Sequence, residues 1–324
     1  MIRLPAFEVL FPASVGEALE MLAAHPGSVP VGAGTDLLPN MKRRQVHPGV
    51  LVSLARIPGL FGIDTASDGT TVIGASTPLA QVADSTEVSP AMREAAALVA
   101  SPQIRNTATI GGNLCVDTRC AFINVTEEWR TASGPCLKAG GDVCWVAPKG
   151  SHCYAISSSD LAPAAIVSGA SVRLVGPAGE RVLPVSDLYR PDGIDHMARR
   201  RDEILTQVLV PPAAGLRTTY LKLRRRQAVD FPMLGVAAGV RLAEDGTVSD
   251  ARIVLGAVSP APLRAVDAEA LLLGRRLDRE TIAAAAELAA KPVRPFDNAD
   301  LGSRYRKWMA AVFVERALGA LAAP

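Results

Sequence analysis

This sequence has little of several features that mark specialised proteins. Of its 324 residues, 4% are aromatic, four are histidine, and the formal net charge is only +2. Without an excess of positive charge, the composition gives no reason to expect binding to nucleic acid or to an anionic membrane. The arginine runs at 199–201 and 224–226 are expected to be solvated faces or salt-bridge partners rather than phosphate sites.

Long hydrophobic runs are also missing. No segment approaches the roughly 18 apolar residues that cross a bilayer, and the N-terminal stretch MIRLPAFEVLF does not resemble a signal peptide. We therefore expect a cytoplasmic protein whose thiols stay reduced and form no structural disulfides. The hydrophobic share of 49% is ordinary for a soluble protein, and the chain is long enough for two cores.

The order of strand and helix patterns predicts two domains of mixed structure. Strands and helices alternate up to Pro211 and Pro212, which with Gly215 predict a domain boundary. Beyond it, strands around a turn at Asp245 are followed by helical stretches at about 265–274, 278–291 and 298–322. The sequence thus predicts an α+β fold with domains at 1–213 and 214–324.

Two short glycine-containing turns, VGAGTD at 31–36 and TATIGGN at 107–113, carry several hydrogen-bond donors. The first is not the dinucleotide motif G-x-G-x-x-G, because Leu37 stands where the third glycine belongs. Glycine nonetheless lets backbone N–H groups approach an anion without a Cβ in the way. We interpret the turns either as holding the two ends of a pyrophosphate-bearing cofactor or as ordinary turns at strand ends.

All five cysteines lie between residues 115 and 153, in one polar loop. Cys120, Cys136, Cys144 and Cys153 are separated by 15, 7 and 8 residues, and Cys115 is left over. Neither the closely spaced pairs of structural zinc sites nor the ferredoxin spacings are present. The pattern indicates a metal site without naming the metal, and buried, unligated cysteines are the alternative.

A loop of this length inside a compact domain needs something to organise it. Its glycines and prolines give it little regular structure of its own. Four thiolates around an iron–sulfur cluster would fix the chain at four points. Trp129 and Trp145 would supply apolar bulk that shields such a centre from water.

Four motifs, VPVGAGTDLL, IRNTATIGGNLC, SSDLAPAAIV and YLKLRRRQAVDFP, resemble in this order the FAD-binding subunits of the molybdenum hydroxylases. The resemblance covers essentially the whole chain. It implies a vanillyl-alcohol-oxidase-type FAD-binding domain, followed by a CO-dehydrogenase-flavoprotein-type C-terminal domain. The iron–sulfur loop would be an insertion at about 115–157.

The insertion resembles that of the β subunit of 4-hydroxybenzoyl-CoA reductases, which carries a [4Fe-4S] cluster. The resemblance implies that the metal ligands are Cys120, Cys136, Cys144 and Cys153. Cys115 is not among them, which accounts for the odd number of cysteines.

The same resemblance implies which residues bind FAD. The pyrophosphate would be cradled by the first turn, Val31, Gly32, Ala33, Gly34, Thr35, Asp36 and Leu37. The second turn would hold the phosphate and ribityl portion through Thr109, Gly112 and Asn113. Asp160 would contact the cofactor, and Lys222 would lie near the flavin ring, where its charge favours the reduced flavin. No histidine lies in a flavin-linking motif, so non-covalent FAD is expected.

The function implied is electron transfer, with no catalytic acid or base in this chain. A ferredoxin-like donor would reduce the [4Fe-4S] cluster. FAD would then connect it to a small [2Fe-2S] subunit and a large molybdenum-cofactor subunit, in a dimer of heterotrimers that dehydroxylates 4-hydroxybenzoyl-CoA. One alternative is a molybdenum hydroxylase that oxidises an N-heterocycle, a purine or an aldehyde. Another is a stand-alone flavin oxidoreductase with a structural zinc loop.

Overall fold

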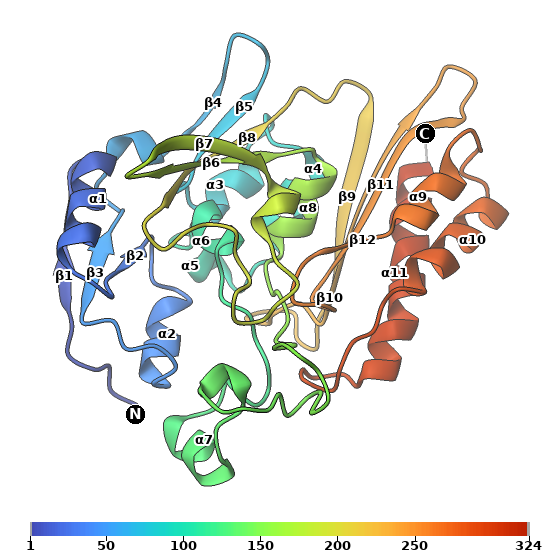
Figure 1. Ribbon diagram of the computed structural model, residues 1–324. Coiled ribbons are helices and arrows are strands. Elements are labelled where there is room, and N and C mark those ends of the chain that lie inside the picture. The colour runs from blue at the N-terminus through green and yellow to red at the C-terminus, as the bar shows by residue number, and fades with distance from the viewer. Residues whose placement is uncertain (1, 323–324) are drawn as a thin grey trace.

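The computed structural model describes residues 2–322, which form three sheets arranged along the molecule (Figure 1). The first sheet is parallel, in the order β1-β3-β2. Its strands and helices are β1 (Glu8–Leu10), α1 (Val15–Ala24), β2 (Val29–Val31), α2 (Leu37–Lys42) and β3 (Val50–Ser53). The Ser14 side chain caps α1 by accepting a hydrogen bond from the Glu17 N–H at 3.1 Å.

The second sheet is antiparallel and central, in the order β4-β5-β8-β6-β7. Its strands are β4 (Ile63–Thr65), β5 (Thr71–Gly74), β6 (Ser171–Gly176), β7 (Gly179–Pro184) and β8 (Ile204–Val210). Buried and half-buried residues alternate along β6, and Val172 and Leu174 are fully buried in the main core. This period of two is what a sheet with one covered face requires.

Short helices pack between the central sheet and the third sheet. They are α3 (Leu79–Asp84), α4 (Pro90–Ala97), α5 (Pro102–Arg105), α6 (Ile110–Leu114) and α8 (Leu161–Val167), with the 3₁₀ turn η3 (Val185–Leu188). The 3₁₀ turn η1 (Pro58–Leu60) packs instead with the first sheet and α1. Helix α4 contacts β9, and α8 contacts β10 and β11, so the first two thirds of the chain and the last third share one core.

The third sheet is antiparallel, in the order β12-β11-β10-β9, and helices cover its outer face. The elements are β9 (Leu216–Leu223), β10 (Leu234–Leu242), β11 (Val248–Gly256), β12 (Leu263–Arg264), α9 (Val266–Leu272), α10 (Arg279–Ala290) and α11 (Ser303–Ala322). Val236 and Ala238 on β10 pack toward these helices, whereas Ala237 faces the main core. The sheet is therefore buried on both faces.

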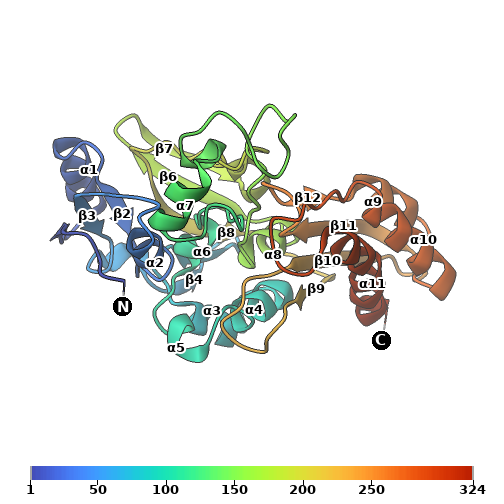
Figure 2. The same cartoon turned by 90° about the horizontal axis from the view of Figure 1, so that it is seen from below.

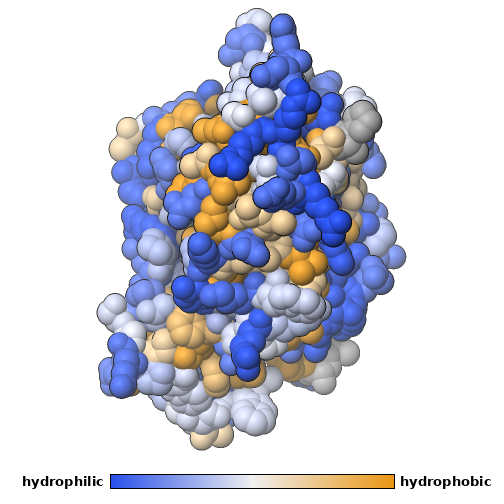
Figure 3. Space-filling view, turned by 90° about the vertical axis from the view of Figure 1, so that its right-hand side faces the viewer, coloured by the Kyte–Doolittle hydropathy of each residue, from blue (hydrophilic) through white to orange (hydrophobic). Residues whose placement is uncertain are grey.

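The view from below places the first sheet and the C-terminal helices at opposite ends of the molecule (Figure 2). The end that carries these helices is covered mostly by hydrophilic residues, with smaller hydrophobic areas between them (Figure 3). Within residues 2–322, no helix combines the length and apolar character needed to span a membrane. The predicted domain boundary falls between the end of β8 and the start of β9.

The cysteine loop extends away from the three sheets (Figure 1). It contains the short helix α7 (Glu127–Ser133) and the 3₁₀ turn η2 (Leu137–Ala139), which agrees with the expectation of little regular structure. Protein contacts anchor it. Arg130 donates to the Arg43 and Arg44 carbonyls at 2.9 and 2.8 Å, and the Asn298 amide donates to the Tyr154 carbonyl at 2.7 Å.

Candidate functional site

Both glycine turns open into one cavity of about 490 Å³. The segments 199–205 and 229–231 complete its wall. Eleven of the twelve residues predicted to bind FAD line it: Val31, Gly32, Ala33, Gly34, Thr35, Asp36, Leu37, Thr109, Gly112, Asn113 and Asp160. A volume of this size is in the range of cofactor pockets.

The two turns touch each other at Gly32 and Thr109. A Cβ added to Gly32 would lie 2.9 Å from Thr109 Oγ1, closer than side chains pack. Thr109 caps the short helix α6, and its hydroxyl oxygen accepts a hydrogen bond from the Gly112 N–H at 3.1 Å. The sequence predicted a second turn here, but the structure shows a helix N-terminus with Thr109 as its cap.

The first turn depends on Gly34, whose φ of +72° lies in the left-handed region that favours glycine. The Gly34 carbonyl accepts from the Leu38 N–H at 2.9 Å and so begins α2. A Cβ at Gly34 would lie 3.0 Å from Leu38, so a larger residue would push the turn and the helix apart.

The Asn113 side chain joins helix α6 to helix α8. Its Oδ1 accepts from Ser159 Oγ at 2.8 Å and from the Leu161 N–H at 3.1 Å, which fixes α6 to the start of α8. The Asn113 side-chain oxygen is therefore used within the protein, on the wall of the cavity.

Asp160 and Lys222 form a buried ion pair rather than two separate charges. Lys222 Nζ lies 2.9 Å from Asp160 Oδ2, and Tyr220 donates to Asp160 Oδ1 at 2.7 Å. The side chains of Lys222 and Asp160 are 1% and 4% exposed. Burial raises the pKa of the Asp160 carboxyl, and Lys222 counteracts this rise. Lys222 does not line the cavity itself but is ion-paired with Asp160, which does, and its place near the flavin ring stays a prediction.

Arg119 is a cavity residue that the sequence did not single out. Its guanidinium lies 3.2 Å from Asp36 Oδ1 and its carbon 3.9 Å from the centre of the Phe231 ring. Burial raises the pKa of Asp36, and the charge of Arg119 opposes that rise. Arg43 and Arg199 also line the cavity. Only the closing of the fold brings these cations to the turns.

Ser158 supplies an unused hydroxyl to the same cavity. It is 3% exposed, and its Oγ has no hydrogen-bond partner within the described residues 2–322. A buried hydroxyl without a partner is costly. A polar ligand in the cavity would supply the missing hydrogen bond, and so the site fits a cofactor rich in oxygen and nitrogen atoms.

A second, smaller cavity lies in the cysteine loop. It is lined by the four cysteines predicted as ligands, Cys120, Cys136, Cys144 and Cys153, together with apolar residues that include Ile123, Trp145 and Ala155. The cysteines are 4–9% exposed, and all five thiols of the chain are free. Burial raises the pKa of Cys120 to about 11 and that of Cys153 above its ordinary value.

The metal prediction receives no direct support from the geometry. In residues 2–322, no three His, Cys, Asp or Glu side chains are arranged so that they could hold a metal ion. The predicted shielding was half wrong, because Trp129 is 67% exposed, whereas Trp145 lines the cavity and packs edge-on against Phe122 at 5.6 Å.

Comparison with known proteins identifies the family. A model described as the FAD binding domain in molybdopterin dehydrogenase matches residues 5–213, and one described as the CO dehydrogenase flavoprotein C-terminal domain matches residues 218–321. The chain belongs to the FAD-binding subunits of the molybdenum hydroxylases. The predicted fold, an FAD-binding domain followed by a flavoprotein C-terminal domain, is confirmed.

Individual relatives agree with this assignment. The carbon monoxide dehydrogenase medium chain of Hydrogenophaga pseudoflava is 32% identical, over 98% of this chain and 97% of its own length. Its solved structure superposes with a TM-score of 0.80 over 98% of both chains. The xanthine dehydrogenase FAD-binding subunit of Escherichia coli O157:H7 is 26% identical, over 87% of this chain and 85% of its own length. These relatives support FAD binding and an oxidoreductase subunit. They do not support the narrower prediction of a 4-hydroxybenzoyl-CoA reductase.

Proposed function

We propose that this chain carries FAD in a molybdenum hydroxylase complex that oxidises an N-heterocycle, a purine or an aldehyde. The observation that carries the proposal is the single cavity formed by both glycine turns, in a chain of this family. By analogy with the relatives, the partners are a large molybdenum subunit and a small [2Fe-2S] subunit, in a cytoplasmic complex.

The residues of this chain have binding and orienting roles in this proposal. The backbone of the first turn would face the pyrophosphate, and Thr109 can still donate its hydroxyl proton while it caps α6. Ser158 would donate its free hydroxyl, and Arg43 and Arg199 would offset phosphate charge. Bound FAD would supply one- and two-electron chemistry, and the substrate would react on another subunit.

The test is a substrate panel on the purified complex. Steady-state rates with purines, N-heterocycles and aldehydes are measured with an artificial electron acceptor, alongside the FAD content per chain. Turnover of one class with about one FAD per chain is expected. Activity of the isolated chain toward any of these substrates would favour the stand-alone oxidoreductase instead.

A second candidate is the reductive dehydroxylation of 4-hydroxybenzoyl-CoA, supplied with electrons by a ferredoxin-like donor. The observation that favours it is the cavity lined by Cys120, Cys136, Cys144 and Cys153. Four buried sulfurs with apolar walls match the donor set of a [4Fe-4S] cluster, in which each cysteine would supply one thiolate. Burial raises the pKa of the Cys120 and Cys153 thiols, so binding iron would have to displace their protons.

Iron and sulfide analysis of anaerobically purified protein tests this candidate. About four irons per chain and a dithionite-reduced EPR signal are expected for wild type. The Cys136→Ser variant is expected to lose the iron and keep FAD. The matched control is Cys115→Ser, which removes the cysteine that does not line the cysteine cavity and is expected to keep the iron. Wild-type protein that contains FAD but no iron would remove this candidate and leave the first proposal intact.

A further inference from the structure

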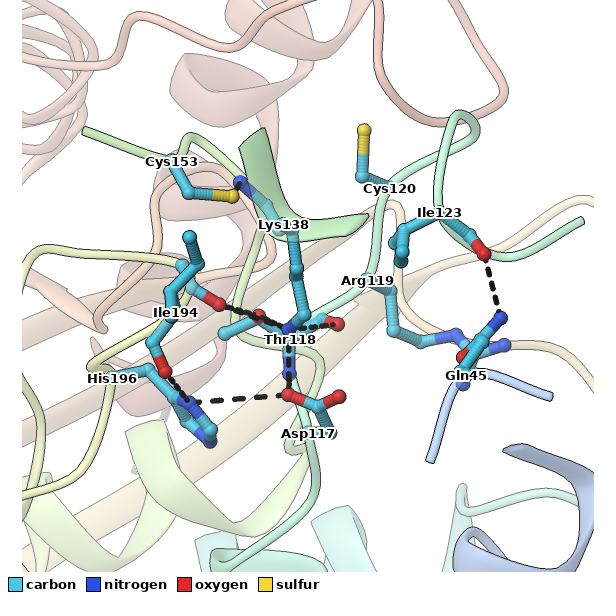
Figure 4. Close-up of polar contacts among 12 residues, drawn as sticks. Gln45, Asp117, Thr118, Arg119, Cys120, Ile123, Lys138, Cys153, Ile194 and His196 are labelled. Carbon is cyan, nitrogen blue, oxygen red and sulfur yellow. Dashed lines mark hydrogen bonds and ion pairs between the residues drawn. The ribbon is translucent and has the colours of Figure 1, made fainter. Parts of the chain in front are cut away.

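One lysine of the cysteine loop reaches from the cysteine cavity to the wall of the FAD cavity. Lys138 lies in η2, lines the cysteine cavity, and extends its ammonium group to Asp117 and Thr118 (Figure 4). Asp117, in turn, lines the FAD cavity. The Lys138 side chain therefore connects two cavities that are otherwise formed by different parts of the chain.

The contacts of Lys138 hold its charge in one place. Its Nζ donates to Asp117 Oδ1 at 2.6 Å, to Thr118 Oγ1 at 2.5 Å and to the Thr118 and Gly193 carbonyls at 3.2 and 2.9 Å. The side chain is only 13% exposed. A lysine held by several acceptors and largely shielded from solvent is a fixed charge, because exposed lysines usually keep their mobility.

The same network reaches the cysteine ligand set. Gly193, whose carbonyl accepts from Lys138, donates its N–H to the Cys153 carbonyl at 2.8 Å. A Cβ on Gly193 would lie 2.8 Å from Cys153 Sγ, so the two segments are in close contact.

Asp117 lies among other charged groups of the cavity wall, because Asp36 and Arg119 both interact with it electrostatically. His196 Nδ1 lies 3.9 Å from Asp117 Oδ1, but burial lowers the pKa of this imidazole and so favours its neutral form. Arg119 directs its guanidinium to Asp36. Lys138 is thus the close cation that offsets the Asp117 carboxylate at the cavity wall.

We propose that Lys138 is a fixed counter-ion that raises the reduction potential of FAD by offsetting the charge of Asp117 on the cavity wall. Reduction adds negative charge to the flavin, and a fixed cation nearby favours that state. The inference rests on the proposed FAD binding and requires no metal cluster.

Lys138→Met tests the inference, because it removes the charge and keeps a long side chain. The two-electron midpoint potential of FAD bound to the full chain is measured against redox dyes. The equilibrium constant for reduction is expected to fall roughly tenfold, equal to about 30 mV for a two-electron couple. Lys138→Arg is expected to retain most of the wild-type potential. The matched control is Lys149→Met, an exposed lysine of the same loop, which is expected to cause no shift.

A compensating variant separates charge from structure. Asp117→Asn alone is expected to raise the flavin potential, and Lys138→Met combined with Asp117→Asn is expected to return it toward wild type. If Lys138 only holds the loop in place, the flavin potential of the double variant should be no closer to the wild-type value than that of Lys138→Met. That result, or an unchanged potential in Lys138→Met with FAD bound, would overturn the inference. The iron content of the same preparations tests the proposed cluster separately. Protein without iron would contradict the cluster but would leave the expected shifts in flavin potential unchanged.

Discussion

The contact between the two glycine turns can be tested by Gly32→Ala. The new Cβ would lie 2.9 Å from Thr109 Oγ1, so the threonine side chain must turn away and release the Gly112 N–H. Losing a threonine N-cap costs about 1 kcal/mol, and a strained rotamer adds about 0.5–1.5 kcal/mol. Together these give an expected penalty of about 1.5–2.5 kcal/mol, which corresponds to a rise in the FAD Kd of about 10- to 70-fold because FAD binding requires the native turn.

The assay is a titration of the apo-protein with FAD, followed by calorimetry or flavin fluorescence. Urea unfolding with and without FAD supplies a second readout, because ligand binding stabilises the native state by an amount set by Kd. The control is Gly49→Ala, where an added Cβ meets nothing within 4 Å, the residue is exposed, and the backbone is not in the left-handed region. It is expected to leave the Kd unchanged.

A double-mutant cycle decides whether the stated contact is the cause. Thr109→Ala removes the atoms that the Gly32 Cβ would approach, so Gly32→Ala should cost less in that background. A coupling energy of about 1 kcal/mol between the two positions is expected, as is usual for residues in contact. If the two changes are strictly additive in the FAD Kd, the turns do not act on each other through this contact and the reasoning fails.

Two further predictions concern the walls of the cavity. Ser158→Ala is expected to raise the FAD Kd about tenfold by removing one hydrogen bond, with little change in the stability of the apo-protein, because its hydroxyl has no partner within residues 2–322. Glu203, whose side chain is 1% exposed, accepts two hydrogen bonds from Arg181, at 2.7 and 2.8 Å, which lower its pKa. Its stabilising contribution is therefore present above the ordinary carboxyl pKa and lost as the pH falls through the lowered folded value. Glu203→Gln should cost about 2 kcal/mol of unfolding free energy at pH 7, with the difference from wild type vanishing in acid. The exposed Glu180→Gln is the control, and a Glu203→Gln penalty that persists at low pH would contradict the reasoning.

The sequence predicted most of the regular elements because their patterns are local. The helical stretches near 266–272 and 279–290 each follow from a period within a few positions. The Ser14 cap and the alternation along residues 171–176, which the structure shows, are features of the same local kind. The last helix begins at Ser303 rather than near 298. Asn298 is instead held by contacts with the cysteine loop, which no local pattern reveals.

The residues of the candidate site likewise fall into those placed by local sequence and those placed by contacts between distant segments. The glycine turns and Asp160 could be predicted, since the residues that shape them are adjacent in the chain. Arg119 could not, because its contacts with Asp36 and Phe231 join positions more than eighty residues apart on either side. The ion pair of Lys222 could not be predicted for a related reason, because its partner Asp160 lies 62 residues away in the sequence.

The chain path between the two cavities argues for a functional connection. Asp117 faces the FAD cavity and Cys120 faces the cysteine cavity, and only Thr118 and Arg119 separate them. Arg119 exchanges two backbone hydrogen bonds of 2.8 Å with Ile156, near the end of the loop, which fixes this short segment from both sides. Lys138 also bridges the two cavities, since it lines the cysteine cavity and pairs with Asp117 on the wall of the FAD cavity. The geometry is the one expected if the two sites exchange charge, and the flavin potential of the Lys138 variants measures that dependence directly.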